Sequence, residues 1–113
     1  MISKMELYIV TDRKASRGRD HMSMVRAALD GGADVIQLRD KDLSGRDLYA
    51  LAREMASLVH ASRARFIVND RLDIALAAGA DGVHLGQYDL PVAAARSLSP
   101  PSFIIGASVG SVE

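Results

Sequence analysis

The 113-residue chain is 49% apolar and 25% charged, which fits one ordinary soluble globular domain over residues 1–113. Its 14 basic and 14 acidic residues cancel, so no global attraction to nucleic acid or membrane is expected. Cysteine is absent, which excludes disulfides and thiolate metal sites and suits the cytoplasm, where we expect the protein. We expect no signal peptide, and no apolar run approaches the roughly 20 residues of a membrane span.

Short apolar runs alternate with helix-like stretches along the chain. The expected strands are residues 7–11, 35–39, 65–68, 82–85 and 103–108. The expected helices are residues 22–29, a second helix after 44, residues 72–78, and a fourth from 91 to about 98. Ser44 is the expected N-cap of the second helix, whose apolar face carries Leu48, Leu51, Met55, Leu58 and Val59. Gly79 closes the third helix, and Pro91 suits the first turn of the fourth.

Strands that alternate with helices at this spacing predict βαβ units and a parallel sheet, hence an α/β fold. A weak repeat supports this, because Gly32-Ala33-Asp34 recurs as Gly79-Ala80-Asp81 before alternate strands. Alternate strands of an α/β barrel contribute to the same interior layers, so the repeat suits a barrel. The alternative is that Gly-Ala-Asp is a common helix-to-strand turn.

Cationic and amide side chains surround the end of the second expected strand. Arg39 and Lys41 suit a pyrophosphate, which needs several cationic donors. The alternative is a solvated surface pair compensated by Asp40 and Asp42. Gln37 lies inside the strand, where its amide needs partners, so it is a hydrogen-bonding interior residue or a ligand contact.

Carboxylates follow the third and fourth expected strands. Asp70 and Asp89 could each bind Mg²⁺, which prefers carboxylate oxygens and substrate phosphates. Helix capping is the alternative at both places, because Asn69 and Asp70 precede one expected helix and Asp89 precedes Pro91. Arg71 is interpreted as structural, paired with nearby carboxylates.

Two hydroxyl- or imidazole-bearing residues complete the set. Ser108 ends the fifth expected strand, and its hydroxyl could touch a substrate. His84 lies inside the fourth strand and is interpreted as a hydrogen-bonded core residue rather than a base. No histidine is near Ser108 in sequence, which leaves a catalytic triad to spatial neighbours alone. Taken together, the strand ends supply cations, an amide, carboxylates and a hydroxyl, as a Mg-pyrophosphate pocket would require.

The chain resembles thiamine phosphate synthase, also called thiamine-phosphate pyrophosphorylase. The matching segments are residues 7–12, 37–41, 69–71, 81–89 and 105–108. Their order and spacing match over nearly the whole chain. The resemblance implies a (β/α)₈ TIM barrel that joins hydroxymethylpyrimidine diphosphate to a thiazole phosphate, giving thiamine phosphate and pyrophosphate.

The resemblance also assigns roles to individual residues. Arg39, Lys41 and Asn69 would bind pyrophosphate, and Asp70 and Asp89 would hold Mg²⁺. The resemblance further implies that Gln37 and Ser108 contact the pyrimidine substrate or the departing group, with Ser108 as the candidate catalytic residue. In the family the pyrophosphate leaves first, and the thiazole nitrogen captures the resulting pyrimidine-methyl cation. Metal and cations would stabilise the negative charge that builds on the leaving group.

The chain departs from the family chiefly in length. We count five expected strands, whereas the barrel needs eight. The partial barrel lacks strands 6–8 and with them the thiazole-phosphate side, so we expect this chain to be inactive or nearly so alone. A smaller departure is Val109-Gly110, which stands where the family has a more polar stretch, often with histidine.

Two alternatives remain open at this point. Exposed sheet edges and an apolar interior favour a non-catalytic fragment that forms homo-oligomers or a strand-completed assembly. A thiazole tautomerase-like phosphate-binding barrel is the other alternative, although it does not require the diphosphate and metal ligands. The expected partners are otherwise small-molecule substrates, with no nucleic acid and no membrane.

Overall fold

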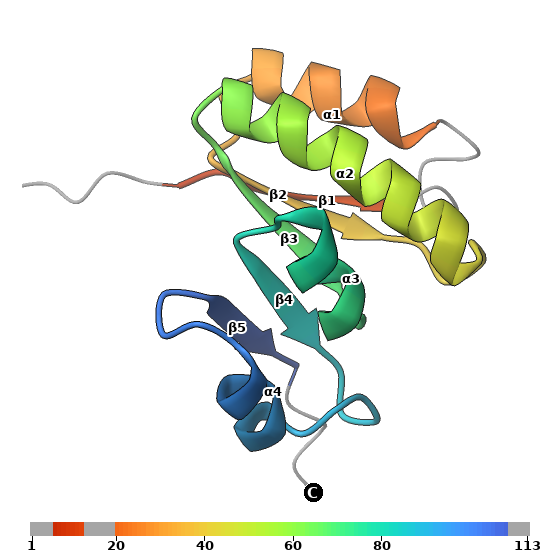
Figure 1. Cartoon of the computed structure of the whole chain (residues 1–113). Helices are drawn as coiled ribbons and strands as arrows, with labels where there is room; N and C mark the ends of the chain where they lie inside the picture. Colours follow the sequence, from red (N-terminus) through yellow and green to blue (C-terminus); the bar gives the residue numbers. More distant parts are fainter. Residues whose placement is uncertain (1–5, 13–19, 109–113) are drawn as a thin grey trace, which may run out of the picture.

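A computed structural model describes residues 6–12 and 20–108, which form one parallel sheet with strand order β1-β2-β3-β4-β5 (Figure 1). The strands are β1 (Tyr8–Asp12), β2 (Val35–Arg39), β3 (Arg65–Asn69), β4 (Gly82–Leu85) and β5 (Ile104–Ala107). The helices are α1 (His21–Asp30), α2 (Gly45–Ala61), α3 (Leu72–Ala78) and α4 (Val92–Leu98). This is the α/β fold that the sequence predicts.

The expected boundaries are confirmed for β2, α3, β4 and the start of α2, and they shift by one residue elsewhere. Ser44 is the N-cap of α2, and its side chain accepts a hydrogen bond from the Asp47 amide at 3.1 Å. Asp20 caps α1 in the same way through the Ser23 amide at 2.9 Å, which starts this helix one residue earlier than expected. The expected loop between the first strand and first helix, the N-terminus and Val109-Gly110 lie largely or wholly outside the described residues.

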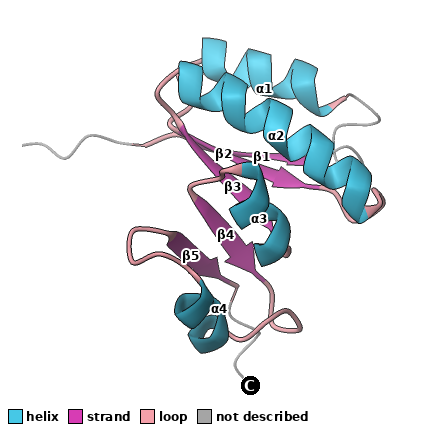
Figure 2. Ribbon diagram, in the orientation of Figure 1, coloured by secondary structure: helices cyan, strands magenta, loops and turns pink. Residues whose placement is uncertain are grey.

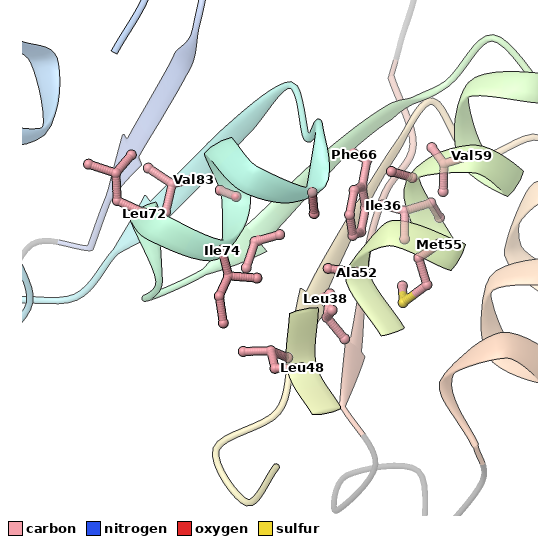
Figure 3. Close-up of a cluster of buried hydrophobic side chains, with 14 of the residues drawn as sticks. Ile36, Leu38, Leu48, Ala52, Met55, Val59, Phe66, Leu72, Ile74 and Val83 are labelled. Atoms are coloured by element: carbon pink, nitrogen blue, oxygen red, sulfur yellow. The ribbon is translucent and has the colours of Figure 1, made fainter. Parts of the chain in front are cut away.

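The helices cover one face of the sheet, as right-handed crossovers between sequential parallel strands require (Figure 2). The core lies between that face and the helices, where Phe66 and Ile36 of the sheet meet Met55 and Val59 of α2 (Figure 3). All four side chains are fully buried. Burying aliphatic and aromatic side chains of this size contributes about 1.5–3 kcal/mol each.

The opposite face of the sheet is open. Tyr8, Val10 and Ile104 expose 47%, 46% and 38% of their surface on this side. Side chains alternate between the two faces along each strand, so Ile36 and Leu38 enter the core while Gln37 lies on the open face. The five described strands thus form an open sheet with one face left uncovered by helices.

The two copies of the Gly-Ala-Asp repeat form the same kind of helix-to-strand turn. Gly32 and Gly79 both have positive φ, +91° and +79°, which glycine adopts without a Cβ penalty. Asp34 accepts a hydrogen bond from the Leu7 amide at 2.8 Å, next to β1, and Asp81 accepts one from the Phe66 amide, also at 2.8 Å, in β3. The repeat is therefore a helix-to-strand turn, and in both copies its aspartate also forms a hydrogen bond at the start of the neighbouring strand that comes earlier in the chain.

No helix in the described residues is long and apolar enough to span a membrane.

Gly82 provides a test of the packing on the open face. A Cβ on Gly82 would lie 2.4 Å from Ile104 O and 2.9 Å from Ile67 Cδ1, so Gly82→Ala must displace β5. We expect it to lower the free energy of unfolding by roughly 1–3 kcal/mol in urea denaturation. Gly31→Ala is the matched control, because its Cβ would meet only ordinary contacts at 3.5 Å, and equal stability of the two variants would contradict the packing.

Candidate active site at the carboxyl ends of the strands

The predicted site residues lie at or near the carboxyl ends of β2 to β5, because parallel pairing brings these ends to one edge of the sheet. A cavity of about 620 Å³ occupies the open face. Four predicted residues line it, namely Gln37, Arg39, Asn69 and Ser108. The other three, Lys41, Asp70 and Asp89, follow the strand ends and form a polar group beside the cavity.

A chain of hydrogen bonds crosses three strands on the cavity wall. Asn69 Nδ2 donates to Gln37 Oε1 at 3.1 Å, and Gln37 Nε2 donates to Tyr8 Oη at 2.6 Å. With its amide turned over, Asn69 would instead donate to both oxygens of Asp70 at 3.0 Å. Gln37 is therefore an interior hydrogen bonder, and its amide also faces the cavity.

The two predicted cations are paired with carboxylates other than those the surface-pair alternative named. Arg39 Nη1 pairs with Asp12 at the end of β1, and Lys41 Nζ lies 3.3 Å from Asp70 Oδ2. Both cationic side chains are partly exposed, so these ion pairs contribute little to stability. Because the pairs are weak, an anionic ligand can compete for the cations.

Asp70 and Asp89 converge beside Gly86. A Cβ on Gly86 would lie 3.0 Å from Asp89 Oδ2 and 3.8 Å from Asp70 Oδ1, so both carboxylates approach the same point. The Gly86 amide donates to Asp89 Oδ2 at 2.6 Å. Burial, and then contact with the Asp89 carboxyl, raise the pKa of Asp70 above its ordinary value, although the Lys41 ammonium opposes this. Two facing carboxylates with one partial counter-charge favour an additional cation.

The capping alternatives for these carboxylates are wrong. The N-caps of α3 and α4 are Arg71 and Pro91, and neither helix has a side-chain cap. Asp70 has a φ of +70°, whereas an N-cap residue adopts an extended backbone. Positive φ is uncommon for residues other than glycine, although aspartate adopts it more readily than most. Asp70 is thus turned toward the strand-end group rather than toward α3.

Arg71 has the structural role that the sequence predicts. Its Nε and Nη2 donate to the two Asp73 oxygens at 3.0 and 2.8 Å. This bidentate contact lowers the pKa of Asp73.

His84 and Ser108 share a hydrogen bond of 2.7 Å between Nε2 and Oγ. The imidazole lies over Gly106, where a Cβ would come within 2.9 Å of Nδ1. No carboxylate bonds to His84 in residues 6–12 and 20–108, so the contacts do not form a Ser-His-Asp triad. The expectation that His84 is hydrogen-bonded is confirmed, and its partner is a predicted site residue. The expectation that it is a core residue is wrong, because its side chain is partly exposed and lines the cavity.

Four residues of this site were not predicted to belong to it: Tyr8, Asp12, His84 and Gly86. Tyr8 and Asp12 share the inward alternation of β1, and Asp12 also ends its strand, so both carried the signal that identified Arg39. Gly86 directly follows β4, and the absence of a side chain there lets the Asp89 carboxylate lie close to the backbone. A glycine next to a strand often marks such a close approach.

The donor set fits magnesium better than a metal held by protein alone. Within the described part of the chain, no group of three or more histidine, cysteine or acidic residues could hold a metal ion. Mg²⁺ commonly binds through one or two carboxylates together with substrate phosphates. Asp70 and Asp89 supply such a pair, and Lys41 lies beside them.

The sheet order, the helices on one face and the strand-end cluster define the chain as a partial TIM barrel with a candidate site at its carboxyl edge. Residues 7–113 match the family described as thiamine monophosphate synthase, and the chain belongs to this family.

Individual relatives belong to the same family. The chain is 61% identical over 107 residues to the thiamine-phosphate synthase of Methanoculleus marisnigri, covering 95% of this chain and 51% of the relative. It is 52% identical over 110 residues to that of Coprothermobacter proteolyticus, covering 97% of this chain and 52% of the relative. Among solved structures, thiamine phosphate pyrophosphorylase from Pyrococcus furiosus superposes with a TM-score of 0.84 at 43% identity, covering 92% of this chain and 50% of that one. The chain thus spans about half the length of the relatives it matches.

The facing carboxylates predict an unusual gain in stability. In metal-free buffer, Asp70→Asn should raise the free energy of unfolding by up to about 1 kcal/mol, because it removes a partly buried charge that faces Asp89. Asparagine tolerates the positive φ of this position about as well as aspartate. Urea denaturation measures the change. Asp73→Asn is the control, which should not stabilise because Asp73 pairs with Arg71 instead; equal destabilisation by both variants would contradict the repulsion.

Proposed function

We propose that this chain supplies the diphosphate- and metal-binding part of a thiamine phosphate synthase. The observation that carries the proposal is the convergence of Lys41, Asp70 and Asp89 beside a cavity that Arg39 and Asn69 line. The substrates would be hydroxymethylpyrimidine diphosphate and a thiazole phosphate. Both are phosphate esters that membranes retain, which suits a reaction in the cytoplasm.

The proposed reaction exchanges one bond for another. The bond between the pyrimidine methylene carbon and the diphosphate oxygen breaks, and its electron pair leaves with pyrophosphate. The lone pair of the thiazole nitrogen then forms the new carbon–nitrogen bond. Neither step requires a strong general base, which agrees with a site that has no Ser-His-Asp triad among the described residues.

Each strand end has a defined task in this mechanism. Arg39 and Lys41 would exchange Asp12 and Asp70 for oxygens of the diphosphate. Asp70 and Asp89 would hold Mg²⁺, which when bound neutralises charge on the departing pyrophosphate. Gln37 and Asn69 would fix the pyrimidine end through the amide chain that crosses β1 to β3.

Ser108 would donate to the departing group from the end of β5. Its hydrogen bond to His84 holds the hydroxyl at the cavity wall. A positioned donor of this kind stabilises charge that develops only in the transition state.

The proposal is tested in an extended chain that continues after Glu113 with the second half of the Pyrococcus furiosus relative. Formation of thiamine phosphate from both substrates and Mg²⁺ is the readout. We expect the extended chain to be active and the 113-residue chain to be at least about 100-fold slower, because it has no counterpart to the relatives' second half. An extended chain that folds, as judged by circular dichroism, yet makes no product would contradict the proposal.

Metal dependence tests whether the facing carboxylates hold Mg²⁺. In the extended chain, Asp89→Asn should lower kcat by about 100-fold or more and raise the Mg²⁺ concentration needed for activity. Asp73→Asn changes a neighbouring carboxylate that faces Arg71 rather than Gly86, so it should leave both values unchanged. Full, Mg-independent activity in Asp89→Asn would contradict the metal-binding role of Asp89.

Self-association is a second candidate, because the open face exposes Tyr8, Val10 and Ile104. Strands β1 and β5 also end the sheet, and each has a described neighbour on one side only. Light scattering after size-exclusion chromatography should show oligomers of the 113-residue chain. A stable monomer at micromolar concentration would count against association.

A further inference from the structure

A buried polar cluster lies behind the candidate site, on the helix side of the sheet. His21, the first residue of α1, exposes only 3% of its surface and Thr11 only 1%. His21 Nε2 lies 2.9 Å from Asp40 Oδ2, and the Asp40 side chain is 2% exposed. The mechanism above uses none of these three residues.

Asp40 stands between the two predicted cations in the sequence. Gln37 and Arg39 line the cavity, while Leu38 enters the core, so the next residue, Asp40, turns to the helix side. There its Oδ1 accepts hydrogen bonds from the amides of Asp42 and Leu43 at 2.9 and 3.1 Å. One buried carboxylate therefore organises the loop that carries Lys41.

The imidazole joins this loop to two strands. His21 Nδ1 lies 3.0 Å from Thr11 Oγ1, and Thr11 Oγ1 donates to Gln37 O at 3.3 Å. Helix α1, which packs on β1 and β2 (Figure 1), does not need His21 as a cap, because Asp20 caps it. The contacts of His21 thus serve the β2–α2 loop rather than the start of its own helix.

We propose that His21 is a positioning residue for the diphosphate site. By holding Asp40 on the helix side, it fixes the positions of its two neighbours, Arg39 at the end of β2 and Lys41 in the following loop. The stability of the fold gives little reason to bury the His21–Asp40 pair, because apolar residues of similar volume often make a protein equally or more stable than a buried ion pair does. The effect on substrate rests on the proposed function, whereas the effect on the loop does not.

The loop is tested by amide hydrogen exchange in the 113-residue chain. In His21→Leu, the amides of Asp42 and Leu43 should exchange about 10-fold faster or more, because their acceptor loses its anchor. The amide of Ala52, inside α2, should keep its wild-type rate. Unchanged exchange at Asp42 and Leu43 would overturn the proposal.

The chain contains a second His–Asp contact that serves as a control, and this one is partly exposed. His60 Nε2 lies 2.7 Å from Asp81 Oδ2, and Asp81 fastens the beginning of β3 rather than its end. His60→Leu therefore removes a second His–Asp contact far from the strand-end loop, and it should leave Asp42 and Leu43 unchanged. Equal acceleration by His60→Leu and His21→Leu would show general destabilisation and overturn the proposal.

The substrate effect is tested in the extended chain. His21→Leu should raise KM for the pyrimidine diphosphate about 10-fold and leave KM for the thiazole phosphate unchanged. His21→Gln should restore most of the affinity, because its amide can still donate toward Asp40. A lower kcat with both KM values unchanged would indicate lost folded protein and overturn the proposal.

If the wild-type extended chain made no product, the proposed function would fail, and the exchange rates alone would decide whether His21 holds the loop.

Discussion

Parallel pairing of five described strands in sequential order is the constraint on which the candidate site depends. It brings the carboxyl ends of β2 to β5 to one edge, and the pleat sends alternate side chains to opposite faces. Apolar residues such as Ile36 and Leu38 are buried under the helices, while Gln37 and Arg39 between and beyond them reach the cavity. The residues of β2 thus serve the core and the site at once.

The charged side chains at this edge form ion pairs that an anionic ligand can replace. Arg39 is held by Asp12 and Lys41 by Asp70, and both pairs are partly exposed. Asp70 and Asp89 face a common point beside Gly86, where burial, and then the facing Asp89 carboxyl, raise the pKa of Asp70. A divalent cation with a diphosphate would satisfy both carboxylates and release the two cations for phosphate oxygens.

The sequence predicts the elements well because their signals are local. The apolar runs locate the strands, Ser44 begins α2, and Gly79 ends α3 with a positive φ. Position at the end of a strand also identifies residues that line one cavity, such as Arg39, Asn69 and Ser108. Specific partners are not local, since the contacts of Ser108 with His84 and of His21 with Asp40 depend on how distant segments pack. The capping alternative at Asp70 likewise fails on one dihedral angle, its φ of +70°, which the residue type alone does not determine.

The most direct test of the site is to locate a bound metal. Mn²⁺ in place of Mg²⁺, added with pyrophosphate, broadens the NMR signals of amides near the metal. We expect the strongest broadening at Asp70, Gly86 and Asp89, and clearly weaker broadening at Phe66 and Asp81 at the opposite end of the strands. Broadening centred on Asp81, or spread evenly over both ends of the sheet, would contradict a metal-diphosphate site at the carboxyl edge.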